Sequence, residues 1–271
     1  MKSIIADLLH LKFSPVAVIW SDTKPEPALS FVPGKRGCLM SLFAQAAKGR
    51  TAAVSRETFG CNGGGTGAGF GNCFVTSPGG IEGFSHFLSN GILGCSHCEE
   101  LKNLADNIPN PEIKKHFLLG EGYRKTPDLV KEFIHNLPVT DIPYTYVIFK
   151  PLKEVKPDEV PRVIVFTANP HQVSALVTLA NFRYGDLGRV IIPASAGCHQ
   201  VMLLPYKEGA SEKPRAVLGL TDPSARQQVM HVLGDDVLTF AVPFTMYKEM
   251  EEDAPGSFLS RSTWKGIEAR L

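Results

Sequence analysis

Apolar positions in the first half of the chain recur with periods that distinguish helices from strands. Leu39, Leu42 and Phe43 recur at about 3.6 residues, the period of an amphipathic helix, and Lys48 and Gly49 follow as the cation and the glycine that commonly end one. Short apolar runs bounded by glycine or proline instead predict strands. The pattern predicts, in order, a helix at Ser3–Leu11, a strand at Val16–Trp20, a helix at Gly37–Lys48, a strand at Thr51–Ser55, a helix at Thr126–Leu137 and a strand at Tyr146–Phe149.

Beyond the charged, proline-bearing stretch Pro151–Pro161, strand and helix patterns alternate. This stretch is the best candidate for a boundary, so we expect an N-terminal half at 1–150 and a C-terminal half at 151–271, unless the chain forms a single domain. The alternation predicts an α/β fold with some parallel strand pairing, and a mixed α+β fold is the alternative. The elements expected here are strands at Val163–Phe166, Val190–Pro193, Ala216–Leu220 and Val237–Val242, helices at His171–Arg183 and between Asp222-Pro223 and Gly234, and a helical tail from Met246.

A weak internal repeat relates the two halves. In each half a strand, a helix and a second strand are followed by a glycine–cysteine pair, Gly60-Cys61 in the first and Gly197-Cys198 in the second. Two related strand–helix–strand halves packed into one compact unit are therefore expected. Because ligands gather at loops outside the carboxyl ends of strands, Cys61 and Cys198 are expected to converge on one site. The alternative stays open that the halves are alike only because all such units resemble one another.

The composition is that of an ordinary globular protein. Of 271 residues, 44% are hydrophobic and 20% are charged, and the formal charge is 28 − 27 = +1. This balance lacks the positive field that a nucleic-acid-binding protein needs. No apolar run approaches the roughly 20 residues that span a bilayer, and Asp7 and His10 interrupt the N-terminal apolar stretch. We therefore expect a cytoplasmic protein without a membrane segment, and we leave open whether it forms a homo-oligomer.

Cysteines are the first candidate chemical groups. In an intracellular chain they are more typical of thiols, metal ligands or redox groups than of a disulfide framework. Twelve of the 25 glycines lie between Gly60 and Gly94, and four of the six cysteines lie in or beside that stretch. The six are Cys38, Cys61, Cys73, Cys95, Cys98 and Cys198.

Cys95-Ser96-His97-Cys98 is a Cys-x₂-Cys element, whose two thiols can face one metal ion. A redox dithiol is the alternative, but it needs a preceding strand, and none is predicted before Cys95. One such element cannot close a tetrahedral site, and the distances in sequence to Cys61 and Cys73 do not match a zinc ribbon. An iron–sulfur cluster tolerates irregular spacing better, because its thiolates can come from distant loops.

The run from Cys61 to Gly71 contains Gly63, Gly64 and Gly65, whose backbone N–H groups could donate to cluster sulfurs or to another ligand. It also contains a permissive form of the dinucleotide-binding fingerprint. The expected strand ends too far before the first glycine for that fingerprint, and no acidic residue stands at the required distance. A tight loop with positive φ angles and close approach of a ligand is the preferred interpretation.

A cysteine nucleophile is a further alternative, carried by Cys198 or Cys38. Such a residue needs a depressed pKa. His199 is adjacent to Cys198 and so points elsewhere, while His171 follows a strand end and could share the same rim. Cys38 opens a predicted helix, whose dipole favours a thiolate.

Nine short segments together are specific to one family: Gly37–Met40, Ala46–Gly49, Phe59–Gly65, Gly83–Ser89, Thr140–Pro143, Ala168–Pro170, Pro193–Cys198, Arg215–Asp222 and Gly256–Leu259. On these segments the chain resembles the DUF169 family over nearly its whole length. The family has no settled activity, so the resemblance implies kinship rather than function. It implies relatives largely in anaerobic prokaryotes, which suits an oxygen-sensitive cofactor. It also implies that Cys38, Cys61 and Cys198 occupy family positions and that the other three cysteines are extras.

The leading hypothesis is a cysteine-ligated metal protein, most simply one that binds an iron–sulfur cluster, with a redox role or a role in transforming a small molecule. Cys61 and Cys198 are the first expected ligands, followed by Cys95 and Cys98 and then by Cys38 and Cys73. With three thiolates and one open iron the site could act as a Lewis acid, in an oxidoreductase or a lyase, whereas a fully ligated cluster would serve an electron-transfer partner. The alternative is a metal-free module that binds a small molecule through its glycine-rich loop.

Overall fold

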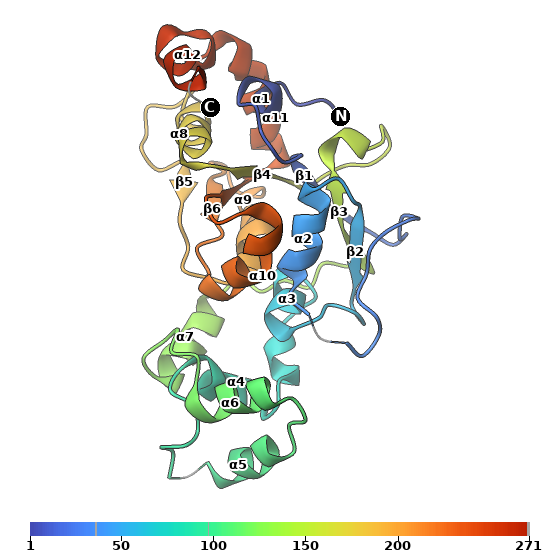
Figure 1. The fold of residues 1–271 in the computed structure, drawn as a ribbon, viewed down its shortest axis with the longest axis vertical. Coiled ribbons are helices and arrows are strands. Elements are labelled where there is room, and N and C mark those ends of the chain that lie inside the picture. Colours follow the sequence, from blue (N-terminus) through green and yellow to red (C-terminus); the bar gives the residue numbers. More distant parts are fainter. Residues whose placement is uncertain (36, 97, 270–271) are drawn as a thin grey trace. The chain divides into compact units, whose positions relative to one another are not determined.

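The computed structural model describes residues 1–35, 37–96 and 98–269. The chain divides into two compact units, each described by itself: residues 1–70 with 141–271, called the sheet unit, and residues 71–140, called the helical unit (Figure 1). This division differs from the one expected near residue 150, because strands from before and after that point belong to one sheet.

Seven strands of the described residues form one sheet in the order β2-β3-β1-β4-β7-β6-β5. Among these seven strands, neighbours are antiparallel except β5 and β6, which pair parallel at one edge of the sheet. β1 lies near the middle, where Val18 pairs with Phe149 on one side and with Val163 on the other. The strands are β1 (Val16–Ser21), β2 (Ala52–Ser55), β3 (Tyr146–Pro151), β4 (Val163–Ala168), β5 (Val190–Ile191), β6 (Ala216–Gly219) and β7 (Leu238–Pro243).

Helices cover both faces of the sheet, because successive strand side chains point to opposite faces and the central strands are apolar on both. Ala17 and Ile19 of β1 pack with one group of helices, while Phe149 of β3 contacts Phe43 of a helix on the other face. The structure confirms a mixed α/β fold. The first group is α1 (Ile4–Leu8), α8 (Pro170–Ala180), α11 (Phe244–Asp253) and α12 (Ser262–Glu268). The second group is α2 (Leu39–Ala47), η3 (His199–Leu203) and α9 (Leu204–Glu208), with α10 (Pro223–Leu233) beside α2 (Figure 1).

Short 3-10 turns complete the sheet unit: η2 (Leu152–Glu154), η4 (Ala254–Gly256) and η5 (Phe258–Ser260). Leu152 and Val155 are buried against the core, although they lie in the stretch expected to be a linker. No helix among the described residues combines the length and the apolar character needed to cross a bilayer.

The helical unit contains η1 (Cys73–Thr76), α4 (Gly80–Leu88), α5 (Glu99–Asp106), α6 (Pro111–Leu119) and α7 (Pro127–Asn136). The start of α7 confirms its sequence prediction: the Thr126 hydroxyl accepts a hydrogen bond from the Leu129 N–H, and Pro127 occupies the first turn. Two small apolar clusters hold this unit, one around Phe74 and Val130 and the other around Ile92.

The glycine-rich run is a helix, which corrects the expectation of a loop. Residues Asn62–Gly67 form α3, and the glycines of positive φ nearest to it, Gly60, Gly69 and Gly71, lie outside the helix. A Cβ added at Gly67 would lie 2.9 Å from the Cys198 carbonyl carbon. Because Gly67 has no side chain, the backbone of α3 lies directly against the segment at Cys198. This packing outweighs the low helix propensity of the glycines.

Candidate functional site

Three cysteines of the sheet unit lie at the N-terminal ends of three helical segments. Cys38 precedes α2, Cys61 precedes α3 and Cys198 precedes η3. The Cys198 thiol donates to the Gly63 carbonyl oxygen at 3.1 Å, and the negative charge of either other thiolate raises the pKa of Cys198. The Gly37 N–H also donates to the Gly60 carbonyl oxygen at 3.4 Å, so these contacts place the helix starts at Cys38, Cys61 and Cys198 next to one another, and these cysteines are called the three-thiol group.

Each sulfur of this group faces a backbone N–H at its helix start. The Gly64 N–H donates to the Cys61 sulfur at 3.2 Å, and the Met40 N–H faces the Cys38 sulfur. The His199 N–H donates to the Ala196 carbonyl oxygen at 2.9 Å, and it also lowers the pKa of Cys198. Such N–H groups carry the positive end of the peptide dipoles, so they stabilise negative charge on sulfur.

Burial outweighs these N–H groups at Cys38 and Cys198 and holds these two thiols protonated at neutral pH. It raises the pKa of the Cys38 thiol from 9.0 to about 11, and the neighbouring Cys61 and Asp222 raise it further while the Met40 N–H acts in the opposite direction. The pKa of Cys198, whose residue is 6% exposed, is also well above its ordinary value, first because of burial and then because of repulsion from Cys61 and Cys38. In the absence of a cation, Cys38 and Cys198 are therefore neutral thiols.

A buried histidine fixes the segment beside Cys198. The His199 Nδ1 atom lies 2.7 Å from the Ser195 hydroxyl and its Nε2 atom 3.1 Å from the Gly63 carbonyl oxygen. A carbonyl oxygen only accepts, so Nε2 carries the proton and Nδ1 accepts from Ser195. Burial lowers the pKa of His199 to about 4, which keeps the ring neutral. Its neighbour Cys198 bonds to the same carbonyl oxygen.

The predicted glycines serve the packing around these thiols. A Cβ on Gly64 would lie 2.9 Å from the Phe59 carbonyl oxygen and 3.3 Å from the Cys61 sulfur, while one on Gly63 would meet nothing within 4 Å. Gly65 is buried within α3. These contacts account for the glycine-rich run through helix packing, without the tight strand-to-helix turn that the dinucleotide fingerprint requires.

Two features of the site were not recognised in the sequence. The Gly37 N–H donates to the Gly60 carbonyl oxygen at 3.4 Å, which ties the segment before Cys38 to the one before Cys61. Asp222 caps α10 as predicted, and its second oxygen accepts from the Gly197 N–H at 3.0 Å. Only the glycine positions and the Asp-Pro pair signalled these contacts, because each partner is distant in the sequence.

The other three cysteines belong to the helical unit. Cys73 is buried in η1. Cys95 and Cys98 form a disulfide, which corrects the expectation of thiols or ligands for this pair in the structure as it stands. His97 of that motif lies outside the described residues. Whether these cysteines join the three-thiol group, as the sequence suggested, stays a prediction.

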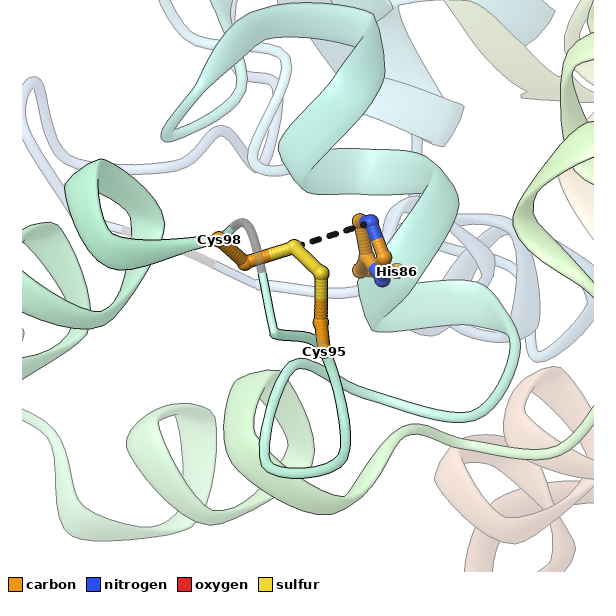
Figure 2. Close-up of side chains that lie close together, drawn as sticks. All are labelled: His86, Cys95 and Cys98. Atoms are coloured by element: carbon orange, nitrogen blue, oxygen red, sulfur yellow. Dashed lines mark hydrogen bonds between the residues drawn. A yellow bond between two sulfur atoms is a disulfide. The ribbon is translucent and has the colours of Figure 1, made fainter.

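A histidine that the sequence analysis missed lies against this disulfide. Figure 2 shows the His86 ring beside Cys98, with its Nε2 atom 3.5 Å from the Cys98 sulfur. The ligand atoms of His86, Cys95 and Cys98 all lie within 4.8 Å of one another, so this group could hold a metal ion. No sequence spacing marked His86, because it comes from the preceding helix α4.

His171 lies exposed in the first turn of α8, where Asn169 provides the cap. It therefore has no part in the geometry described for the three-thiol group.

A comparison with protein families matches residues 4–253 to a family described as DUF169, uncharacterised ArCR. No curated protein matches the chain, and no solved structure matches it.

Proposed function

The chain belongs to the DUF169 family, and we propose that Cys38, Cys61 and Cys198 hold an iron–sulfur cluster on which a small molecule is bound and transformed. The convergence of three thiols from three helix starts carries this proposal. The three are the cysteines that the resemblance assigned to family positions. The cluster would have four irons, with three ligated by these cysteines and one left open to substrate.

The donor set fits such a group. Thiolates are the ligands that iron–sulfur clusters take, and N–H groups directed at their sulfurs are a common means of tuning them. Gly64 provides one of these N–H groups for Cys61, and the first turns of α2 and η3 provide the others. Because iron atoms separate the thiolates of a cluster, the three sulfurs need not approach as closely as ligands of a single ion.

Three thiolates are unfavourable in the apo protein, because burial and mutual repulsion raise the pKa values of Cys38 and Cys198. Iron cations would remove both penalties, and loading would release the thiol protons. Cys198 must then give up its hydrogen bond to the Gly63 carbonyl oxygen. His199 keeps its own bond to that oxygen, so the backbone of α3 stays attached to the segment at Cys198.

An open iron would supply a Lewis acid for an oxygen atom of the substrate. The chain's own residues would then hold the cysteine ligands in position and leave space beside them. Ser195 fixes the tautomer of His199, and neutral His199 positions Cys198 against α3. Gly63, with open space where a side chain would stand, leaves room beside the thiols.

A cysteine nucleophile has weaker support. Catalytic thiols have depressed pKa values, whereas burial raises the pKa of both Cys38 and Cys198. The metal-free binding module has weaker support, because two of the three glycines that it relied on, Gly64 and Gly65, are buried in α3.

The experiment is anaerobic reconstitution with ferrous iron and sulfide, followed by visible absorption and by iron and sulfide analysis. We expect a brown protein, and we expect Cys38→Ser, Cys61→Ser and Cys198→Ser each to lose most of the charge-transfer absorption. Cys73→Ser is the matched control and should retain it. A wild-type protein that stays colourless and binds no iron would contradict the proposal and favour the metal-free module.

A further inference from the structure

The Cys95–Cys98 disulfide lies against a histidine whose lone pair points at sulfur. The His86 Nδ1 atom lies 3.1 Å from the Gly91 carbonyl oxygen, which can only accept, so Nδ1 carries the proton. In the neutral ring Nε2 is then the unprotonated nitrogen, and it faces the Cys98 sulfur at 3.5 Å. A backbone carbonyl that fixes the tautomer in this way is the usual second partner of a metal-binding histidine.

A carboxylate faces the same nitrogen. Glu82 lies one turn before His86 in α4, with its Oε1 atom 3.4 Å from Nε2, while Lys131 holds the other carboxylate oxygen at 2.7 Å. An imidazole lone pair and a carboxylate oxygen that face each other repel unless a proton or a metal cation lies between them, and a metal cation would use both groups as ligands. The side chains of Glu82, His86 and Cys95 also line a cavity of about 390 Å³, which gives a path of entry from solvent.

We propose that His86, Cys95, Cys98 and Glu82 form a redox-controlled zinc site, which is empty while the disulfide is present and binds Zn²⁺ when the disulfide is reduced. Two thiolates at Cys-x₂-Cys spacing, one imidazole and one carboxylate are ligands that tetrahedral Zn²⁺ accepts. This site is independent of the proposed cluster, because it uses none of the three cysteines assigned there.

The redox step balances with a dithiol carrier. The dithiol transfers two electrons and two protons to the Cys95–Cys98 disulfide and leaves as its own disulfide. Zn²⁺ then displaces the two thiol protons into solvent and forms two Zn–S bonds, while the His86 lone pair and a Glu82 oxygen complete the coordination. In the reverse direction the two zinc-bound thiolates pass two electrons to the carrier disulfide, which takes two protons from solvent to become a dithiol, and the ion is released.

The helical unit is small enough that a metal site would contribute to its stability. Below roughly 70–80 residues a single apolar core seldom suffices, and small units add disulfides or metal ions. The core around Ile92 includes Cys98 and reaches α5 and α6 through Ala105 and Phe117. The disulfide closes only the short loop before α5, whereas the zinc ion would also fasten that loop to α4 through His86 and Glu82.

The test measures zinc bound per chain by the full-length protein, with and without tris(2-carboxyethyl)phosphine, which becomes its oxide as it reduces the disulfide. We expect reduced wild type to bind one more Zn²⁺ than oxidised wild type. Cys95→Ser/Cys98→Ser should bind equally in both conditions, since any zinc on other thiols is common to both. Equal binding by the two forms of wild type would overturn the proposal.

Glu82→Gln tests the fourth ligand without touching the disulfide. Its reduced form should bind Zn²⁺ at least about tenfold more weakly and give an altered d–d spectrum with Co²⁺. Glu100→Gln, an exposed residue of α5, is the control and should match wild type. Unchanged affinity and an unchanged Co²⁺ spectrum in Glu82→Gln would refute the assignment of Glu82.

Discussion

The Cys198 thiol donates a hydrogen bond to the carbonyl oxygen of Gly63 at 3.1 Å, across 135 positions of sequence. The contact exists because the backbone of α3 can approach the segment at Cys198 without a side chain between them. It places the two glycine–cysteine pairs of the sequence, Gly60-Cys61 and Gly197-Cys198, in one site. The proposed cluster site therefore depends on how closely α3 and η3 pack.

Gly67→Ala tests this close packing. Its Cβ would lie 2.9 Å from the Cys198 carbonyl carbon and 3.0 Å from the His199 Cδ2 atom, so α3 and η3 must separate. We expect the free energy of unfolding to fall by about 1–3 kcal/mol, with iron retention after reconstitution reduced. Chemical denaturation and iron analysis measure the two effects.

The control for that substitution is Gly63→Ala in the same helix. Its Cβ meets nothing within 4 Å, and alanine favours the helix by up to about 1 kcal/mol. Its stability should equal or exceed that of wild type. Equal effects of the two substitutions would show that close approach of α3 to Cys198 is not what the glycines provide.

Thiol reactivity should report the raised pKa values. With a pKa of about 11, about one Cys38 in ten thousand is a thiolate at pH 7. Alkylation of Cys38 by iodoacetamide in the metal-free protein should therefore be slow at pH 7 and rise about tenfold per pH unit up to pH 10. Cys198 should react more slowly still. Peptide-level mass spectrometry measures both rates, and rapid labelling of either thiol at pH 7 would revive the nucleophile hypothesis.

His199 should make the protein sensitive to acid. Its folded-state pKa of about 4 lies below its ordinary 6.5. The unfolded chain therefore binds a proton first as pH falls, and the stability present above pH 6.5 is lost down to about pH 4. The linkage amounts to about 3 kcal/mol. Urea unfolding at pH 7 and pH 4 should show a smaller loss for His199→Gln than for wild type.

His171→Gln is the control for this measurement, since His171 is exposed in α8. It should lose as much stability as wild type between the two pH values. If His199→Gln shows the same loss as well, acid sensitivity arises elsewhere and the buried neutral ring is not its cause.

Local patterns predicted the elements that local physics determines. The strand at Val16–Trp20 and the helix start at Thr126 needed only apolar runs, caps and prolines, and both are present. Which strands pair with one another could not be predicted from local patterns. The stretch expected to be a linker instead continues from β3 into η2 and buries Leu152, because the strands on either side of it share a sheet.

The cysteines of the proposed site were named from the sequence, but the helix beside them was not. Glycine's poor helix propensity favoured a loop at Gly63–Gly65. The structure instead makes this segment part of a helix, in which Gly67 lies so close to the segment at Cys198 that a Cβ there would be 2.9 Å from the Cys198 carbonyl carbon. Likewise His86 gave no signal, since its relationship to Cys98 depends on how α4 lies beside the loop that precedes α5.

The most direct test of the proposed cluster is the Mössbauer spectrum of anaerobic protein reconstituted with ⁵⁷Fe. Three cysteine ligands on a four-iron cluster predict one iron site distinct from the other three, and a Cys61→Ser variant should lose the cluster spectrum. A spectrum of mononuclear iron alone, or an unchanged cluster spectrum in Cys61→Ser, would contradict the assignment of Cys38, Cys61 and Cys198 as ligands of one cluster.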